Sequence, residues 1–148
     1  MSVLMTEIEN HVLTISLNRP EKHNALNTAL TQALLDAVLD GRTRLDALCV
    51  EGSLLRGPNG TGRFHMLAGT QLPMIDWVRR LSARAKHVVA VGSCAAWGGI
   101  TAGGDNPTDA CGLQYDDDRP GGLLGADFRA RGGLPVINIA GCPTHPGW

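Results

Sequence analysis

The sequence predicts a three-layer α/β fold, in which a mostly parallel sheet of four to five strands carries helices on both faces. Two observations carry this prediction. Short β-rich apolar segments alternate with segments of helical periodicity, and the spacing between strands leaves room for a helical crossover. With 148 residues and a 43% hydrophobic fraction, the chain can form a core of ordinary size.

The strands are predicted from runs of β-branched and apolar residues that end at glycine, asparagine or serine. Residues 11–18 (HVLTISLN) alternate apolar and polar side chains, and Val88–Val91 is a short continuous apolar run typical of a buried strand. The predicted strands are residues 11–18, 45–50, 88–91 and 136–139.

The helices are predicted from apolar residues at helical spacing. Asn27 or Thr28 can cap a helix over residues 28–39, because both side chains accept hydrogen bonds from free backbone N–H groups. Residues 74–85 form a second amphipathic segment, and residues 123–131 form a short third one. Residues 98–122 contain many glycines and read as irregular. This order of elements is flavodoxin-like.

Charge and composition exclude several classes of partner. The net charge is −1 and no basic stripe is present, so nucleic acid and anionic membrane surfaces are poor candidates. No apolar run approaches the length of a membrane span, and the N-terminus lacks the layout of a signal peptide. We therefore expect a cytoplasmic protein whose four cysteines are reduced thiols or ligands.

Two of the cysteines follow predicted strands. Val88–Gly99 (VVAVGSCAAWGG) places Cys94 after one strand, and the segment VINIAGCP places Cys142 after another. Ligands of open α/β sheets bind at the carboxyl ends of the strands, so these two thiols are predicted to share a ligand. Cys49 lies within a strand pattern and is expected in the core.

Other motifs admit both a functional and a structural interpretation. Cys142 and His145 could give half of a zinc site with Cys94 and Cys111, and Gly57–Gly62 could cradle a phosphate, although it lacks the Gly-Lys-Ser/Thr of a P-loop. The three aspartates at 116–118 lack the spacing of a calcium loop and favour a solvated turn. Glu51, after a strand, could relay protons or accept structural hydrogen bonds.

Residues 39–148 resemble the small subunit of nickel–iron hydrogenases, most of all the hydrogen-sensing and uptake types. The resemblance rests on five segments in the same order as in that family. These segments are LDALCVEGS (45–53), GPNGTGRFHMLAG (57–69), VGSCAAWGG (91–99), DNPT (105–108) and GCPTHPGW (141–148).

The resemblance implies an electron-transfer role through a proximal [4Fe-4S] cluster and docking to a hydrogenase large subunit, which binds the nickel–iron centre. The chain alone is therefore not expected to activate hydrogen. In the family four thiolates hold the cluster, and Cys94 and Cys142 match two of them. The other two come from a Cys-x-x-Cys turn after the first strand, where this chain has no cysteine. Cys111 is the remaining candidate ligand, and Glu51 is expected near the cluster.

Residues 11–38 resemble the start of the enoyl-CoA hydratase/isomerase (crotonase) family, through the phrase NRPEK-x-NALN. The sequence is therefore predicted to be a chimera of a 1–38 segment and a 39–148 segment within one combined domain, joined near residues 36–40. The chimera implies a truncated hydrogenase small subunit, or a remnant without cofactor. The crotonase resemblance by itself would imply an acyl-CoA enzyme, but the oxyanion-hole and acid–base residues of that family do not follow.

Overall fold

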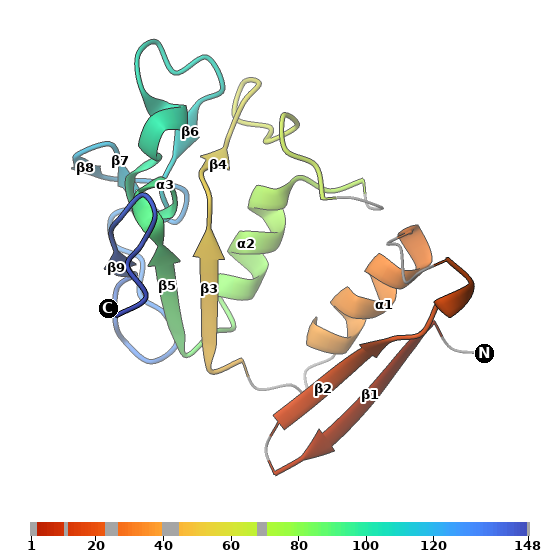
Figure 1. Cartoon of the computed structure of the whole chain (residues 1–148). Helices are drawn as coiled ribbons and strands as arrows, with labels where there is room; N and C mark the ends of the chain where they lie inside the picture. Colours follow the sequence, from red (N-terminus) through yellow and green to blue (C-terminus); the bar gives the residue numbers. More distant parts are fainter. Residues whose placement is uncertain (1–2, 11, 23–26, 40–44, 68–70, 148) are drawn as a thin grey trace. The chain divides into compact units, whose positions relative to one another are not determined.

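The structure, a computed structural model, describes residues 3–10, 12–22, 27–39, 45–67 and 71–147. The chain divides into two compact units, one of residues 1–44 with 67–71 and the other of residues 45–66 with 72–148 (Figure 1). Among the described helices, none combines the length and apolar character needed to span a bilayer.

The first unit is a hairpin followed by a helix. Strands β1 (Leu4–Glu9) and β2 (Val12–Leu17) pair antiparallel, and the helical turn η1 (Pro20–Lys22) leads toward helix α1 (Thr28–Leu39). The Asn27 side chain caps α1, because its Oδ1 accepts a 2.9 Å hydrogen bond from the Leu30 N–H. The predicted helix and its cap are confirmed.

The prediction that residues 11–18 form a strand of the parallel sheet is wrong. Its partner is β1, which the sequence analysis did not assign, and the two strands meet at a tight turn in which Asn10 has a φ of 48°. A hairpin needs only a short turn, whereas parallel pairing needs a long crossover. The adjacent strand β1 therefore pairs with β2 in place of a strand that is distant in the sequence.

The second unit is built on a parallel sheet of three strands, with β5 (His87–Val91) between β3 (Ala47–Glu51) and β9 (Ile137–Ile139). Figure 1 shows β5 continuing into helix α3 (Gly92–Trp97), and helix α2 (Met74–Ser82) beside β3. Four to five strands were predicted, and the described residues show three in this sheet. The α/β class and its parallel pairing are confirmed.

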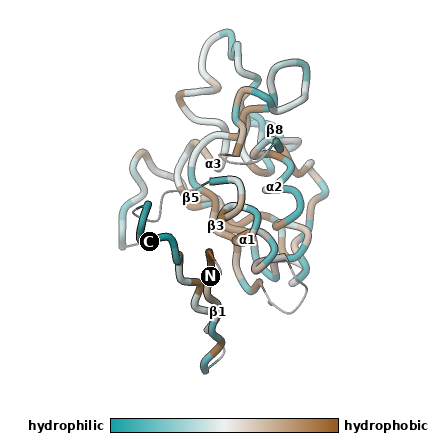
Figure 2. Tube along the Cα trace, turned by 90° about the vertical axis from the view of Figure 1, so that its right-hand side faces the viewer, coloured by the Kyte–Doolittle hydropathy of each residue, from teal (hydrophilic) through white to brown (hydrophobic). Residues whose placement is uncertain are grey.

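One face of this sheet forms the core of the unit. Val88 and Ala90 are fully buried, and the apolar side chains beside them on β3 pack against the same cluster, which also contains Ile75 and Val78 of α2. Figure 2 shows hydrophobic residues along β3 and β5.

The opposite face of the sheet is more exposed in the described part of the second unit. Cys49, Val89 and Ile137 lie in register on it, and Ile137 is 41% exposed. Cys49 is exposed, so the prediction that it belongs to the core is wrong. Its position within an apolar strand could not reveal which face is covered. Parallel sheets are normally covered on both faces, which makes this face unusual.

Residues 98–122 are less irregular than predicted. They contain a 3₁₀ turn and pieces of two short antiparallel ladders, of which one pairs with a strand at residues 54–55. These elements are η2 (Gly99–Ala102), β4 (Leu54–Leu55) with β6 (Ala110–Cys111), and β7 (Tyr115–Asp116) with β8 (Arg119–Pro120).

The short helix predicted at residues 123–131 is absent from this described segment. The side chain of Gln114, only 5% exposed, binds the backbone there instead. Its Nε2 donates to the carbonyl oxygens of Ala126 and Phe128, at 2.8 and 3.2 Å, and its Oε1 accepts from the Val136 N–H at 2.8 Å. These carbonyls are therefore not available in the helical pattern.

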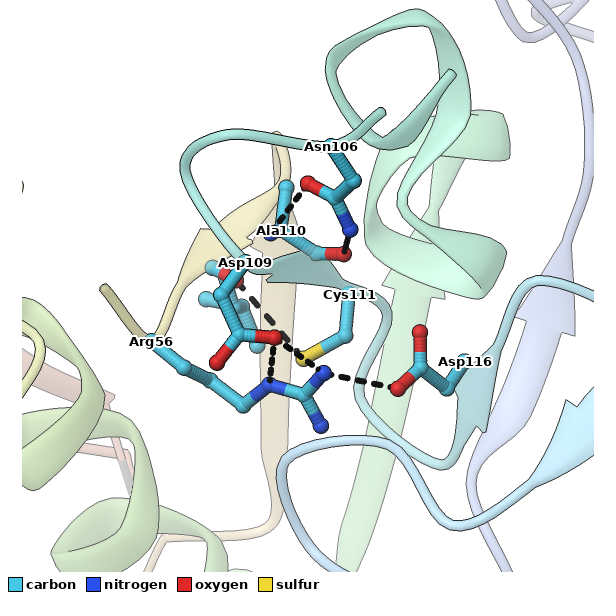
Figure 3. A network of polar contacts seen from close by, with 7 residues as sticks. Arg56, Asn106, Asp109, Ala110, Cys111 and Asp116 are labelled. Carbon is cyan, nitrogen blue, oxygen red and sulfur yellow. Dashed lines mark hydrogen bonds and ion pairs between the residues drawn. The ribbon is translucent and has the colours of Figure 1, made fainter. Parts of the chain in front are cut away.

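Arg56 joins β4 to the loops around β6 and β7. Its guanidinium donates to Asp109 at 2.6 and 3.1 Å and to Asp116 at 2.7 Å (Figure 3). Burial lowers the pKa of Arg56, but the hydrogen bonds to Asp116 and Asp109 outweigh this effect and raise the pKa. Asp116, the first of the three aspartates at 116–118, therefore forms a structural ion pair with Arg56.

Candidate functional site

The candidate site is a cavity of about 500 Å³ at the carboxyl ends of the three parallel strands. Cys94 lies in the first turn of α3, directly after β5, and Cys142 lies three residues after the end of β9. The cavity is lined by Glu51, Gly52, Val91, Gly92, Ser93, Cys94, Gly141, Cys142, Pro143 and Thr144. The structure thus brings together Glu51 and the two cysteines that the sequence analysis paired.

Reciprocal hydrogen bonds hold the two cysteine-bearing turns together. The Ser93 N–H donates to the Gly141 carbonyl at 2.9 Å, and the Gly141 N–H donates to Ser93 Oγ at 3.2 Å. The hydroxyl of Thr144 donates to the Ile139 carbonyl at 3.4 Å. The backbone around Cys94 and Cys142 is therefore fixed by the protein itself.

Gly99 leaves space for the Cys94 thiol. A Cβ at this position would lie 2.6 Å from Cys94 Sγ and 2.9 Å from Cys94 Cα, and the φ of Gly99 is +56°. Only glycine meets both conditions without displacing the thiol. Ser53 Oγ also donates to the Gly98 carbonyl at 2.7 Å, which ties the turn after Glu51 to the end of α3.

The thiols of the cavity differ in access. Cys142 is exposed and Cys94 is half-buried, while the Glu51 side chain is exposed. Thiolates are soft ligands for zinc, copper(I) and iron–sulfur clusters. The cavity can therefore present two cysteine side chains to a ligand that enters from solvent.

Cys111 lies outside this cavity. It is fully buried on β6, and its thiol donates to the Leu54 carbonyl at 3.6 Å. Burial raises the pKa of Cys111 to about 11, and the nearby Arg56 charge only partly opposes this. A buried, protonated thiol is a poor metal ligand. The structure therefore does not bring Cys111 to the position expected of a further cluster ligand.

The alternative metal sites gain no support. Among the residues that the structure describes, no group of three or more histidine, cysteine or acidic side chains is arranged to hold a metal ion. His145 does not line the cavity, and its Nδ1 accepts a 3.0 Å hydrogen bond from the Gly147 N–H. Gly57–Gly62 forms a turn in which Thr61 Oγ1 donates to the Pro58 carbonyl.

The roles of Ser93 and Thr144 were not predicted from the sequence. Both line the cavity, and Ser93 makes the bond between the turns. Ser93 directly precedes Cys94 and Thr144 lies two residues after Cys142, and these positions were the available signal, because a hydroxyl beside a strand-end turn can bond to a neighbouring backbone.

A cubane [4Fe-4S] cluster normally takes four protein ligands, usually cysteines. The sequence has four cysteines, and the cavity is lined by two of them. The two cysteines that line the cavity therefore do not fit this cluster, because they supply only two of its four ligands.

The parallel sheet and its two strand-end cysteine turns define an α/β protein whose candidate ligand site lies at the carboxyl edge of the sheet. The family model described as NADH ubiquinone oxidoreductase, 20 Kd subunit, matches residues 4–148, and the chain belongs to this family.

Its relatives are hydrogenase small subunits. The chain is 36% identical over 143 residues to the hydrogenase-2 small chain of Escherichia coli K12, covering 94% of this chain and 33% of that protein. It is 38% identical over 108 residues to the F420 non-reducing hydrogenase II small subunit of Methanosarcina mazei, covering 68% and 26%.

A solved structure supports the same relationship. The actinobacterial-type NiFe-hydrogenase from Ralstonia eutropha H16 superposes with a TM-score of 0.63 at 31% identity, covering 87% of this chain and 37% of that one. The chain spans 33% and 26% of the length of these two relatives and 37% of the solved chain.

The family match also bears on the predicted chimera. It runs across the segment that resembles crotonases, and none of the relatives named above is a crotonase. These comparisons thus lend no support to a join near residues 36–40, of which residue 40 lies outside the described part of the chain.

Proposed function

We propose that this chain is the cysteine-bearing α/β portion of an electron-transfer subunit that associates with the large subunit of a nickel–iron hydrogenase. The observation that carries the proposal is the meeting of Cys94 and Cys142 at one cavity, in a chain whose relatives are hydrogenase small subunits. A redox group held there would supply one-electron transfer, with the Ser93–Gly141 hydrogen bonds fixing its position.

The proposed partner surface consists of two exposed apolar residues outside the strands of the sheet. Ile100, just after α3, is 84% exposed, and Phe64 is 54% exposed. Exposed large apolar side chains of this kind mark contact surfaces when they gather on one side of a protein. We propose that these residues contact the large subunit.

Co-expression with a nickel–iron hydrogenase large subunit tests the proposal. The two chains are expected to co-purify in equal amounts, and Ile100→Ser is expected to weaken the complex about tenfold or more, as for an interface hot spot. Leu134→Ser is the matched control, because Leu134 is also apolar and 47% exposed but lies outside the proposed surface. Failure of the unmodified chain to bind would overturn the proposal.

A further inference from the structure

The loop Gly57–Gly62 (GPNGTG) carries Asn59 and Gly60 at its tip, and Asn59 is the only asparagine in the sequence that is followed by glycine. Both residues are exposed, and their φ angles are 51° and 74°. The Thr61 N–H donates to the Pro58 carbonyl at 3.0 Å, which closes a turn with Asn59 and Gly60 at its centre. The turn therefore presents the asparagine to water.

The residue that follows Asn59 decides how its side-chain amide can react. A backbone nitrogen that follows asparagine can attack the side-chain amide carbon and close a succinimide ring. A side chain on the following residue crowds this attack, and glycine has none. No atom lies within 4 Å of the position that a Cβ of Gly60 would take, so the surrounding loop leaves the nitrogen uncrowded as well.

We propose that Asn59 is a site of spontaneous deamidation. The Gly60 nitrogen forms a bond to Asn59 Cγ, the bond from Cγ to Nδ2 breaks, and the proton of the Gly60 N–H leaves with Nδ2 as ammonia. Water then adds to either carbonyl carbon of the succinimide and opens the ring, which gives aspartate or isoaspartate. The reaction needs no oxidant or reductant. Either product adds one negative charge to a chain whose net charge is −1.

Two other asparagines lack one or more of these features. Asn106 has a similar φ of 44°, but it precedes Pro107, whose nitrogen carries no hydrogen to lose. The Asn106 side chain is also held by two hydrogen bonds to the backbone of Ala110, at 2.8 and 2.9 Å. Asn138 lies within strand β9 and precedes the β-branched Ile139, which crowds the attack. Both asparagines therefore serve as internal controls.

The base of the loop is fixed and supports Phe64. The Gly57 N–H donates to the Thr108 carbonyl at 3.0 Å, and the Gly62 N–H donates to the Arg56 carbonyl at 2.7 Å. The Phe64 ring packs against Gly57, because a Cβ on Gly57 would lie 2.7 Å from both Cδ2 and Cε2 of the ring. Deamidation therefore creates a charge two residues from the glycine that Phe64 packs against.

This position gives the modification a consequence that rests on the proposed function, in which Phe64 contacts the large subunit. A carboxylate at the edge of an apolar contact loses hydration when a partner covers it, and this loss disfavours binding. Deamidation of Asn59 is therefore expected to weaken the association with the large subunit as the protein ages.

Mass spectrometry of peptides from the purified chain tests the inference. The chain is incubated in mildly alkaline buffer, in which the Gly60 N–H loses its proton more readily. We expect aspartate and isoaspartate to accumulate at Asn59 while Asn106 and Asn138 stay intact. Gly60→Ala is expected to slow the conversion several-fold, because its methyl group crowds the nitrogen, and circular dichroism checks that this variant is folded. An intact Asn59, or equal conversion at Asn138, would overturn the inference.

Binding of Asn59→Asp to a nickel–iron hydrogenase large subunit tests the consequence. We expect this variant to bind about threefold or more weakly than the unmodified chain. Asn10→Asp is the matched control, since it adds the same charge at another exposed turn residue of positive φ, 48°. Equal binding of the two variants would overturn the effect on the partner. Failure of the unmodified chain to bind would overturn the proposed function and this effect together, whereas the deamidation is decided by mass spectrometry alone.

Discussion

Ser93 and Gly141 exchange two hydrogen bonds, one from each backbone N–H, over distances of 2.9 and 3.2 Å. Each residue directly precedes a cavity-lining cysteine, Cys94 or Cys142. The backbone therefore sets the relative position of the two cysteine-bearing turns before any ligand is bound.

Ser93→Ala removes the oxygen that accepts the Gly141 N–H. We expect the free energy of unfolding to fall by about 1 kcal/mol, the usual net contribution of one hydrogen bond. Urea unfolding followed by circular dichroism measures this. Ser82→Ala is the comparison, because Ser82 is fully buried whereas Ser93 is half-buried, and Ser82 Oγ has no hydrogen-bond partner among the described residues. A loss in the control as large as in Ser93→Ala would show that the bond to Gly141 is not the cause.

Gly99→Ala forces a methyl group against Cys94 Sγ. We expect a loss of about 3 kcal/mol in the free energy of unfolding, from backbone strain and the close contact together. Gly104→Ala is the matched control, since Gly104 also has a positive φ, +66°, but nothing lies within 4 Å of its Cβ position. The control is expected to lose only about 1 kcal/mol. Equal losses in thermal or urea unfolding would contradict the predicted contact with the thiol.

Arg56→Met leaves Asp109 and Asp116 without their shared cation. Because Arg56 is largely shielded and makes charge-assisted bonds to both, we expect a loss of about 2 kcal/mol in the free energy of unfolding. Arg79→Met is the comparison, since Arg79 forms an exposed pair with Asp76 at 3.6 Å and is expected to change stability by less than about 0.5 kcal/mol. Similar unfolding midpoints for the two variants would refute this difference.

The raised pKa of Cys111 predicts that the folded protein loses stability at high pH. Its folded pKa of about 11 lies above the ordinary cysteine pKa of 9.0, so between these values the unfolded state releases the proton and the folded state keeps it. The unfolded state then binds fewer protons, and stability falls as pH rises from about 9 to about 11, by about 2–3 kcal/mol in total.

Urea unfolding at several pH values measures this slope, and Cys111→Ala removes the ionisable group. The variant is expected to start less stable, because it loses buried volume, but to lose less stability between pH 9 and 11. An unchanged slope in Cys111→Ala would assign the effect to other groups.

Much of the fold could be predicted from local patterns. The capped helix at Thr28–Leu39 and the strands at Ala47–Glu51 and His87–Val91 carry their signal in their own residues. Which strands pair with one another could not be predicted from these local patterns. The pattern of residues 12–17 specifies a strand but not its partner, and the side chain of Gln114 cancels a helix that residues 123–131 favour locally.

The candidate site, like the fold, could be predicted only in part from local patterns. Cys94 and Cys142 could be predicted to lie together, because both follow strands of one parallel sheet. Cys111 and Cys49 could not be placed, because burial depends on which faces the neighbouring elements cover. A single sequence also does not reveal that the hydroxyl of Ser93 bonds to a turn 48 residues away.

That separation governs when the site can form. During synthesis Cys94 leaves the ribosome well before Cys142, and the two turns can bond only after the segment between them has folded back along β5 to form β9. Long-range contacts of this kind close late in folding. Insertion of any cofactor that needs both thiols therefore follows the completion of the sheet.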